Sequence, residues 1–125
     1  KSEIFYPFIG YLLKLNGAIP VYRKEKNNVV QQIVDLFNNS EELILGIAPE
    51  GTRSKVNKWK TGFYHIALKA NVPILLCKLD YKNKQVGIFK KINPSSNYEK
   101  DMKFIEDAFR DIKGKIPEYY NPDIF

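Results

Sequence analysis

The stretch "LILGIAPEGTRS", Leu43 to Ser54, joins an aliphatic run to a short polar segment. From Leu43 to Ala48 there is no polar alternation, which is typical of a strand buried on both faces of a sheet. Pro49 ends the run, and a glutamate, a glycine, a threonine and an arginine follow at once. A loop after a buried strand is a common ligand site in α/β proteins, because the strand fixes the backbone while the loop presents charge and hydroxyls. The stretch therefore predicts an interior strand that opens into a binding loop.

The spacing of apolar residues on both sides of this stretch predicts four helices and three further strands. We expect helices at Ile4–Leu15, from Val29 to a stop at Asn38-Asn39-Ser40, at Gly62–Ala70 and at Tyr98–Ile112, and further strands at Ala18–Tyr22, Pro73–Leu79 and Val86–Phe89. A turn at residues 82–84 makes the last two strands a hairpin, and "KIPEYYNPDIF" reads as an irregular tail. Alternating strands and helices predict an α/β fold, a layered mixed sheet flanked by helices.

Composition and charge limit the possible functions. The 125 residues are 44% hydrophobic, which predicts one globular domain over residues 1–125. Lys and Arg number 20 against 14 Asp and Glu, and the net charge of +6 favours anionic partners such as phosphate, acidic lipid headgroups or nucleic acid. No apolar segment reaches the roughly 18 residues that cross a bilayer, so membrane contact is expected to be peripheral. The single Cys77 excludes an internal disulfide and is predicted to be a small buried hydrophobe.

Three blocks of the sequence carry a resemblance to a known family. They are "GAIPVYR" (Gly17–Arg23), "APEGTRS" (Ala48–Ser54) and "VPILLCKLDY" (Val72–Tyr81). Together they resemble three of the four ordered blocks of the lysophospholipid acyltransferase family, whose best-known activity is acylation of 1-acylglycerol 3-phosphate. The similarity is greatest to the short bacterial form, in which the second block runs on into "KWKTGFYHIA". It spans about Phe5 to Ile112 and implies a glycerol-3-phosphate acyltransferase-like fold that is incomplete at the N-terminus.

The residues of the second block suit a phosphate ligand. Arg53 can bind two phosphate oxygens at once, and Arg23, at the end of another predicted strand, can add a second guanidinium to form a phosphate clamp. A glycine lets the backbone turn sharply, and a threonine hydroxyl can donate or accept. The resemblance assigns acceptor binding to five residues, and a structural or acceptor-binding role to a sixth. They are Arg23, Glu50, Gly51, Thr52 and Arg53, and then Pro73. Taken singly, Arg23 could equally be a solvated charge near a strand end, an isolated glutamate-glycine-threonine-arginine string is more often a surface turn, and Pro73 is more typical of a strand start. The joint pattern reverses the first two of these readings.

The lysines and aromatic residues that follow the loop are expected to have structural or surface roles rather than a role in the site. Lys55, Lys58 and Lys60 are expected to form a solvated basic face that can also attract an anionic headgroup. The aromatic residues that follow, Trp59, Phe63 and Tyr64, are expected to pack in the core rather than contact lipid. The chain contains no helix-turn-helix, zinc spacing or aromatic-rich binding strand, so nucleic acid is not an expected partner.

The resemblance also implies the reaction and its partners. An acyl thioester, acyl-CoA or acyl carrier protein, is the expected co-substrate, with no other cofactor and no metal. A lysophospholipid is the expected acceptor, on the cytoplasmic side of an anionic membrane that the protein contacts peripherally. A non-catalytic module that binds phospholipid or an anionic membrane is the alternative, since it would keep the arginines and the basic face.

A general base is the missing component. In the family it is a histidine followed, five positions later, by an aspartate that orients the imidazole. The only histidine here, His65, follows the arginine loop, and the position five residues on is Ala70. We therefore expect His65 to be a partly buried helix residue with a local hydrogen bond. The chain begins at Lys1 and its only methionine is Met102; we expect an inactive fragment of an enzyme whose base lies upstream.

Overall fold

The computed structural model describes residues 29–52, 54–121 and 123–125. The helix expected at Ile4–Leu15 and the strand expected at Ala18–Tyr22 lie outside the described residues. The chain divides into two compact units, Lys1–Leu43 and Ile44–Phe125.

In the first unit, the helix α2 spans Val29–Asn38, as the sequence predicts. Its apolar residues recur at helical spacing, and Ile33 and Val34 are buried. The side chain of Asn39 donates to the carbonyl of Asp35 over 2.7 Å. The same carbonyl also accepts from the backbone N–H of Asn39 over 3.0 Å, so Asn39 donates twice to the last turn of the helix.

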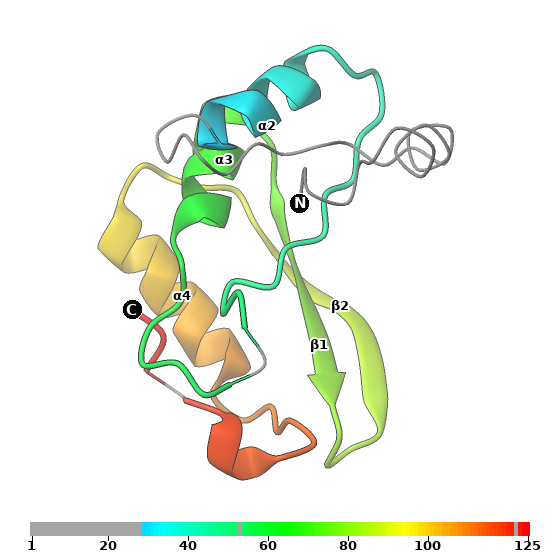
Figure 1. Cartoon of the computed structure of the whole chain (residues 1–125), viewed down its shortest axis with the longest axis vertical. Coiled ribbons are helices and arrows are strands. Elements are labelled where there is room, and N and C mark those ends of the chain that lie inside the picture. The colour runs from blue at the N-terminus through cyan, green and yellow to red at the C-terminus, as the bar shows by residue number, and fades with distance from the viewer. Residues whose placement is uncertain (1–28, 53, 122) are drawn as a thin grey trace, which may run out of the picture. The chain divides into compact units, whose positions relative to one another are not determined.

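The second unit holds a helix, a hairpin, a second helix and a short 3₁₀ turn (Figure 1). The elements are α3 at Gly62–Ala70, β1 at Ile74–Asp80, β2 at Gln85–Ile92, α4 at Tyr98–Phe109 and η2 at Pro117–Tyr119. The predicted helix at Gly62–Ala70, the predicted hairpin and most of the last predicted helix are therefore confirmed. Figure 1 shows α4 running alongside the hairpin.

Local signals explain where these elements begin and end. Asn71 adopts a left-handed conformation at φ 53° and ends α3, and Pro73 follows before the chain enters β1. Asn97 caps α4 by accepting from the backbone N–H of Lys100 over 3.1 Å. At the hairpin turn, the carboxylate of Asp80 accepts from both the backbone and the side chain of Asn83.

β1 and β2 pair antiparallel with one irregularity. Leu79 lies opposite Val86 and Cys77 opposite Ile88, but Leu76 lies opposite Lys90. The register therefore shifts between Leu76 and Cys77, as in a β-bulge, in which one extra residue is accommodated on one strand.

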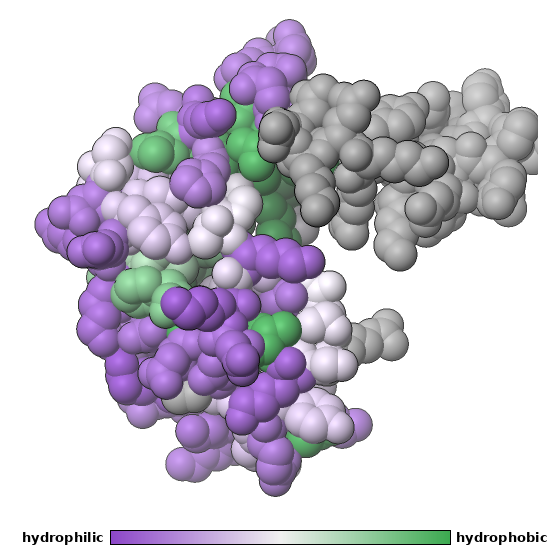
Figure 2. Space-filling view, turned by 60° about the vertical axis from the view of Figure 1, so that its left-hand side comes forward, coloured by the Kyte–Doolittle hydropathy of each residue, from purple (hydrophilic) through white to green (hydrophobic). Residues whose placement is uncertain are grey.

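A single core cluster joins the elements of the second unit. Its buried members are Tyr64, Leu76, Met102, Ile105 and Ile124, which come from α3, β1, α4 and the C-terminal tail. Figure 2, which brings the α4 side of the molecule forward, shows mostly hydrophilic side chains there. Helix α4 is thus amphipathic in the predicted way, with its apolar face turned to the core.

Two predictions about burial are wrong. Leu43–Ala48 is not a strand, and Ile44 is 92% exposed rather than buried on both faces. A strand needs a hydrogen-bonded neighbour, and the described residues pair only β1 with β2. Cys77 is exposed rather than buried, because strand residues alternate between faces and it shares the outer face of β1 with Leu75 and Leu79.

The last helix and the tail also differ from expectation. α4 ends at Phe109, not Ile112, and the hydroxyl of Tyr120 donates to the carbonyl of Phe109 over 2.7 Å. A side chain from the tail therefore satisfies the end of the helix. The tail, expected to be irregular, forms the 3₁₀ turn η2 and contributes Ile124 to the core.

The described residues confirm the α/β class at a coarse level. They contain three α-helices and a two-stranded antiparallel sheet. The layered mixed sheet and the glycerol-3-phosphate acyltransferase-like fold stay predictions.

Candidate functional site

The polar loop after Ala48 is a tight turn. The backbone N–H of Gly51 donates to the carbonyl of Ala48 over 3.1 Å, which closes a β-turn through Pro49 and Glu50. Gly51 has φ 66°, a left-handed conformation that a residue with a Cβ adopts only at a cost. The glycine in this block is therefore required by the backbone.

Lys60 lies across this turn, although it is nine residues further along the chain. Its backbone N–H donates to the carbonyl of Pro49 over 2.9 Å. A Cβ placed on Gly51 would lie 2.9 Å from Nζ of Lys60, so the ammonium group sits against the glycine. The sequence predicts Lys60 on a solvated basic face that can also attract an anionic headgroup, but it does not predict the contact with Gly51. Its position two residues before the helix that follows the loop was the available signal.

The polar groups of the turn are accessible. Glu50 is half-buried, and Gly51, Thr52 and Lys60 are exposed. The Thr52 hydroxyl oxygen accepts from the backbone N–H of Ser54 over 3.2 Å, which leaves the hydroxyl proton free to donate. Among the described residues, Lys60 has no acidic partner within ion-pair distance. The turn thus presents a cation, a hydroxyl and a carboxylate around a glycine.

The remaining predicted site residues are Arg23, Arg53 and Pro73. Arg23 and Arg53 lie outside the described residues, so the phosphate clamp stays a prediction. Pro73 is exposed and immediately precedes β1, where its fixed φ and missing N–H suit a strand start.

His65 is exposed, so the expectation that it is partly buried is wrong. Its imidazole stacks on the ring of Tyr98, with centroids 6.4 Å apart and planes 3° apart, and it meets Tyr64 edge to face at 5.8 Å. No side-chain hydrogen bond joins His65 to another described residue, contrary to the expected local bond. Among the described residues, no carboxylate orients this imidazole, and an orienting carboxylate is the partner that a catalytic base of this kind uses.

The buried titratable groups next to His65 form a closed network. The hydroxyl of Tyr64 donates to Asp101 over 2.9 Å, and Ser95 donates to the same carboxylate from its backbone N–H at 2.6 Å and its hydroxyl at 2.8 Å. Burial and then the hydrogen bond to Asp101 raise the pKa of Tyr64 to about 12. Burial would raise the pKa of Asp101, but the hydrogen bonds from Ser95 and Tyr64 outweigh it and lower that pKa. The network is satisfied internally and holds the helices α3 and α4 together.

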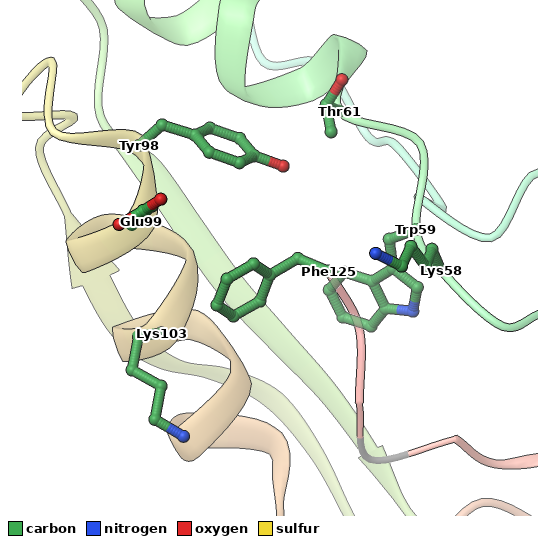
Figure 3. Close-up of a pocket in the computed structure, with 7 residues that line it drawn as sticks. All are labelled: Lys58, Trp59, Thr61, Tyr98, Glu99, Lys103 and Phe125. Atoms are coloured by element: carbon green, nitrogen blue, oxygen red, sulfur yellow. The ribbon is translucent and has the colours of Figure 1, made fainter.

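A separate cavity of about 590 Å³ opens beside α4 (Figure 3). Its walls are mainly aromatic and basic, and the lining residues are Lys58, Trp59, Thr61, Tyr98, Glu99, Lys103 and Phe125. None of Glu50, Gly51 and Thr52 lines it. The aromatic residue Trp59 packs edge to face on Phe109 at 5.4 Å, as expected of a packing residue. The loop and the cavity are therefore different places on the second unit.

Comparison with protein families identifies a match over most of the chain. Residues 1–78 match the model of the family described as Acyltransferase. The matched segment contains both Gly51 and Lys60, whose ammonium group lies against that glycine, and it ends within β1.

Curated relatives carry one enzyme name in bacteria and plants. The 1-acyl-sn-glycerol-3-phosphate acyltransferase of Escherichia coli is 33% identical over 90 residues, which is 67% of this chain and 37% of the relative. The enzymes of that name from Haemophilus influenzae and Cocos nucifera are each 35% identical over 60% of this chain, covering 33% and 26% of their own lengths. The chain thus spans little more than a third of these relatives, or less. No solved structure matches it. In the part of the chain that is described, no helix is both long and apolar enough to cross a membrane.

Proposed function

The chain belongs to the acyltransferase family, and we propose that it is part of an enzyme that acylates a lysophospholipid such as 1-acylglycerol 3-phosphate. The acyl donor in this proposal is a thioester, acyl-CoA or acyl carrier protein. The observation that carries the proposal is the turn at Glu50–Thr52 with the ammonium of Lys60 against Gly51. The names of the curated relatives support the same acceptor.

The turn suits the phosphate of such an acceptor. Lys60 offers a positive charge that has no acidic partner among the described residues, and Thr52, the neighbour of Gly51, offers a hydroxyl proton. Gly51 has no side chain, so a ligand can approach the backbone closely. Glu50 can accept from a glycerol hydroxyl, and Arg53, which follows Thr52 directly, would add a bidentate guanidinium in this proposal.

The chemical step is transfer of the acyl group from sulfur to oxygen. The acceptor hydroxyl attacks the thioester carbonyl while a base takes its proton, and the C–S bond then breaks to release the thiol. We place the base outside this chain, in an upstream histidine and aspartate pair, and give the residues of the turn the task of holding the acceptor phosphate. The 125-residue chain alone is accordingly expected to be inactive.

Binding of the acceptor phosphate to the turn is tested by titrating the 125-residue chain with glycerol 3-phosphate and, separately, with glycerol. Glycerol 3-phosphate should bind, and Lys60→Ala should weaken it roughly 5- to 20-fold, because a charge-assisted contact is lost. Lys69→Ala removes another exposed lysine, from the last turn of α3, and should change the affinity less than twofold. Equal binding of glycerol and glycerol 3-phosphate would contradict the proposal.

An acyl-transfer assay separates the enzyme from the non-catalytic alternative. A longer protein that includes this chain and an upstream histidine should transfer the acyl group and lose the activity when that histidine is replaced, while His65→Ala should leave turnover nearly intact. Activity of the 125-residue chain that falls roughly a hundredfold in His65→Ala would instead make His65 the base.

Peripheral contact with an anionic membrane is the second part of the proposal. The hairpin exposes Leu79, Val86 and Ile88, and exposed lysines at residues 82, 84, 90 and 91 lie on the same two strands and their turn. Apolar side chains flanked by lysines suit an anionic bilayer surface. Co-sedimentation should show more binding to anionic than to neutral vesicles and a decline as salt increases. Equal binding to both vesicle types would refute this part.

A further inference from the structure

The C-terminal segment, defined here as Asn121 and Asp123–Phe125, binds the chain that leads away from the Glu50–Thr52 turn. The side-chain amide of Asn121 donates to the carbonyl of Asn57 over 2.6 Å and to that of Val56 over 3.3 Å. It also donates to the carbonyl of Asp123 over 2.9 Å, and its own oxygen accepts from the N–H of Asp123 over 3.2 Å. One asparagine thus joins the tail to a segment 64 residues earlier.

Ile124 continues this attachment from a buried position. Its side chain is 1% exposed and belongs to the core cluster. Its carbonyl accepts from the backbone N–H of Trp59 over 2.8 Å, and its N–H donates to the carboxylate of Glu106 over 3.1 Å. Glu106 is itself buried on α4. The segment is therefore anchored to a helix on one side and to residues 56–59 on the other.

The next residue after Trp59 is Lys60, which lies across the turn. Its N–H donates to the carbonyl of Pro49, and its ammonium group sits against Gly51. A continuous series of contacts therefore runs from α4 through Ile124 and Trp59 to the turn. Each hydrogen bond in the series is between 2.8 and 3.1 Å.

Residues 55–60 have no helix or strand of their own. The ladder hydrogen bonds that would hold a strand are missing there, so the position of Lys60 depends on the groups that bind its neighbours. Those groups are the carbonyl of Ile124, the amide of Asn121 and the carbonyl of Pro49. The first two come from the C-terminal segment.

We propose that the C-terminal segment positions the Glu50–Thr52 turn and Lys60, with Asn121 and Ile124 as positioning residues. Both lie beyond residue 78, where the match to the family ends. Asn121 bonds Val56 and Asn57 and Ile124 bonds Trp59, so each acts on the turn through the segment that leads to Lys60. The consequence for acceptor binding rests on the function proposed above, whereas the ordering of the turn does not.

Residue-resolved hydrogen exchange of the 125-residue chain tests the positioning. Asn121→Ala should speed exchange of the Trp59, Lys60 and Gly51 amides roughly five- to tenfold relative to the hairpin amides, because the bonds that hold residues 56–59 are lost. The matched control is Asn83→Ala, which removes an asparagine amide that donates to Asp80 at the hairpin turn. It should leave the exchange of these three amides unchanged.

A second variant keeps the test decisive if Asn121→Ala does not fold. Asn121→Asp has nearly the same volume and retains the oxygen that accepts from Asp123, but it cannot donate to the carbonyls of Val56 and Asn57. It should accelerate exchange at the same three amides. Unchanged exchange in the folded variants, or an increase shared equally by the hairpin amides, would overturn the proposal.

Glycerol 3-phosphate is the ligand that tests whether the C-terminal segment affects acceptor binding at the turn. Measured well below the unfolding temperature, its affinity should fall roughly threefold or more in Asn121→Asp and stay unchanged in Asn83→Ala. Faster exchange at the turn in a chain whose wild type binds no glycerol 3-phosphate would support the positioning and refute the proposed function. Unchanged affinity despite faster exchange would overturn the link between the segment and the site.

Discussion

The two faces of the hairpin have similar side chains and opposite environments. On the inner face, Leu76 is 4% exposed and belongs to the core cluster with Met102 and Ile105 of α4. On the outer face, Leu79 is 63% exposed and its partner Val86 is 73% exposed. Leu76 and Leu79 are the same residue type on one strand, so their chemistry does not account for the difference. Burial here depends on which face the helix covers, since successive strand residues point to opposite sides.

The largest effect is expected where the inner face meets α4. Leu76→Ala should lower the free energy of unfolding by about 2 to 4 kcal/mol, because it removes buried apolar atoms and leaves a cavity in the core. Urea denaturation measures this. A loss below about 1 kcal/mol would mean that the core collapses to fill the space and that the inner face is loosely packed.

An intermediate effect is expected at the polar contact between α3 and α4. Tyr64→Phe removes the hydroxyl that donates to Asp101 and should lower the free energy of unfolding by about 1 to 2 kcal/mol, since a buried hydrogen bond to a carboxylate is lost. Ser95 still satisfies Asp101 in the variant, which limits the loss. A neutral result would show that the contact adds specificity rather than stability.

The pH dependence checks the same contact. A tyrosine in the unfolded chain ionises with its ordinary pKa of 10.0, whereas in the folded chain the pKa of Tyr64 is raised to about 12. Its contribution is therefore fully present below pH 10 and is lost as the pH rises toward 12. Asp101 has the opposite pH dependence, because its pKa is lower in the folded chain than in the unfolded chain. The stability that it contributes is present above its unfolded pKa and is lost as the pH falls through its folded pKa. The difference between wild type and Tyr64→Phe should accordingly narrow between pH 10 and 12.

The smallest effect is expected on the outer face. Leu79→Ala should change the free energy of unfolding by less than about 0.5 kcal/mol, because the side chain is mostly in contact with solvent. Leu79→Ala makes the same substitution as Leu76→Ala on the opposite face of β1. The two variants should therefore differ clearly in their loss of free energy of unfolding. A loss similar to that of Leu76→Ala would show that the outer face is covered in solution.

Local signals in the sequence were enough to find most of the described elements. The periodicity of Val29–Asn38 and Gly62–Ala70 matches the helices α2 and α3, and the turn at residues 82–84 lies between β1 and β2. These features depend on neighbouring residues alone, and so they can be recognised without the fold. The prediction of a strand at Leu43–Ala48 is wrong because a strand also needs a hydrogen-bonded partner, which the aliphatic run itself does not specify.

For the candidate site, the sequence by itself determined the turn and the family. Pro49 and Gly51 specify the tight turn through their backbone preferences, and the three ordered blocks indicated the acyltransferase family that residues 1–78 match. The tertiary structure alone placed Lys60 against Gly51 and brought Asn121 and Ile124 to the segment that carries it. Those contacts join residues 9 to 65 positions apart in the chain through hydrogen bonds and a shared core, and no local periodicity records them.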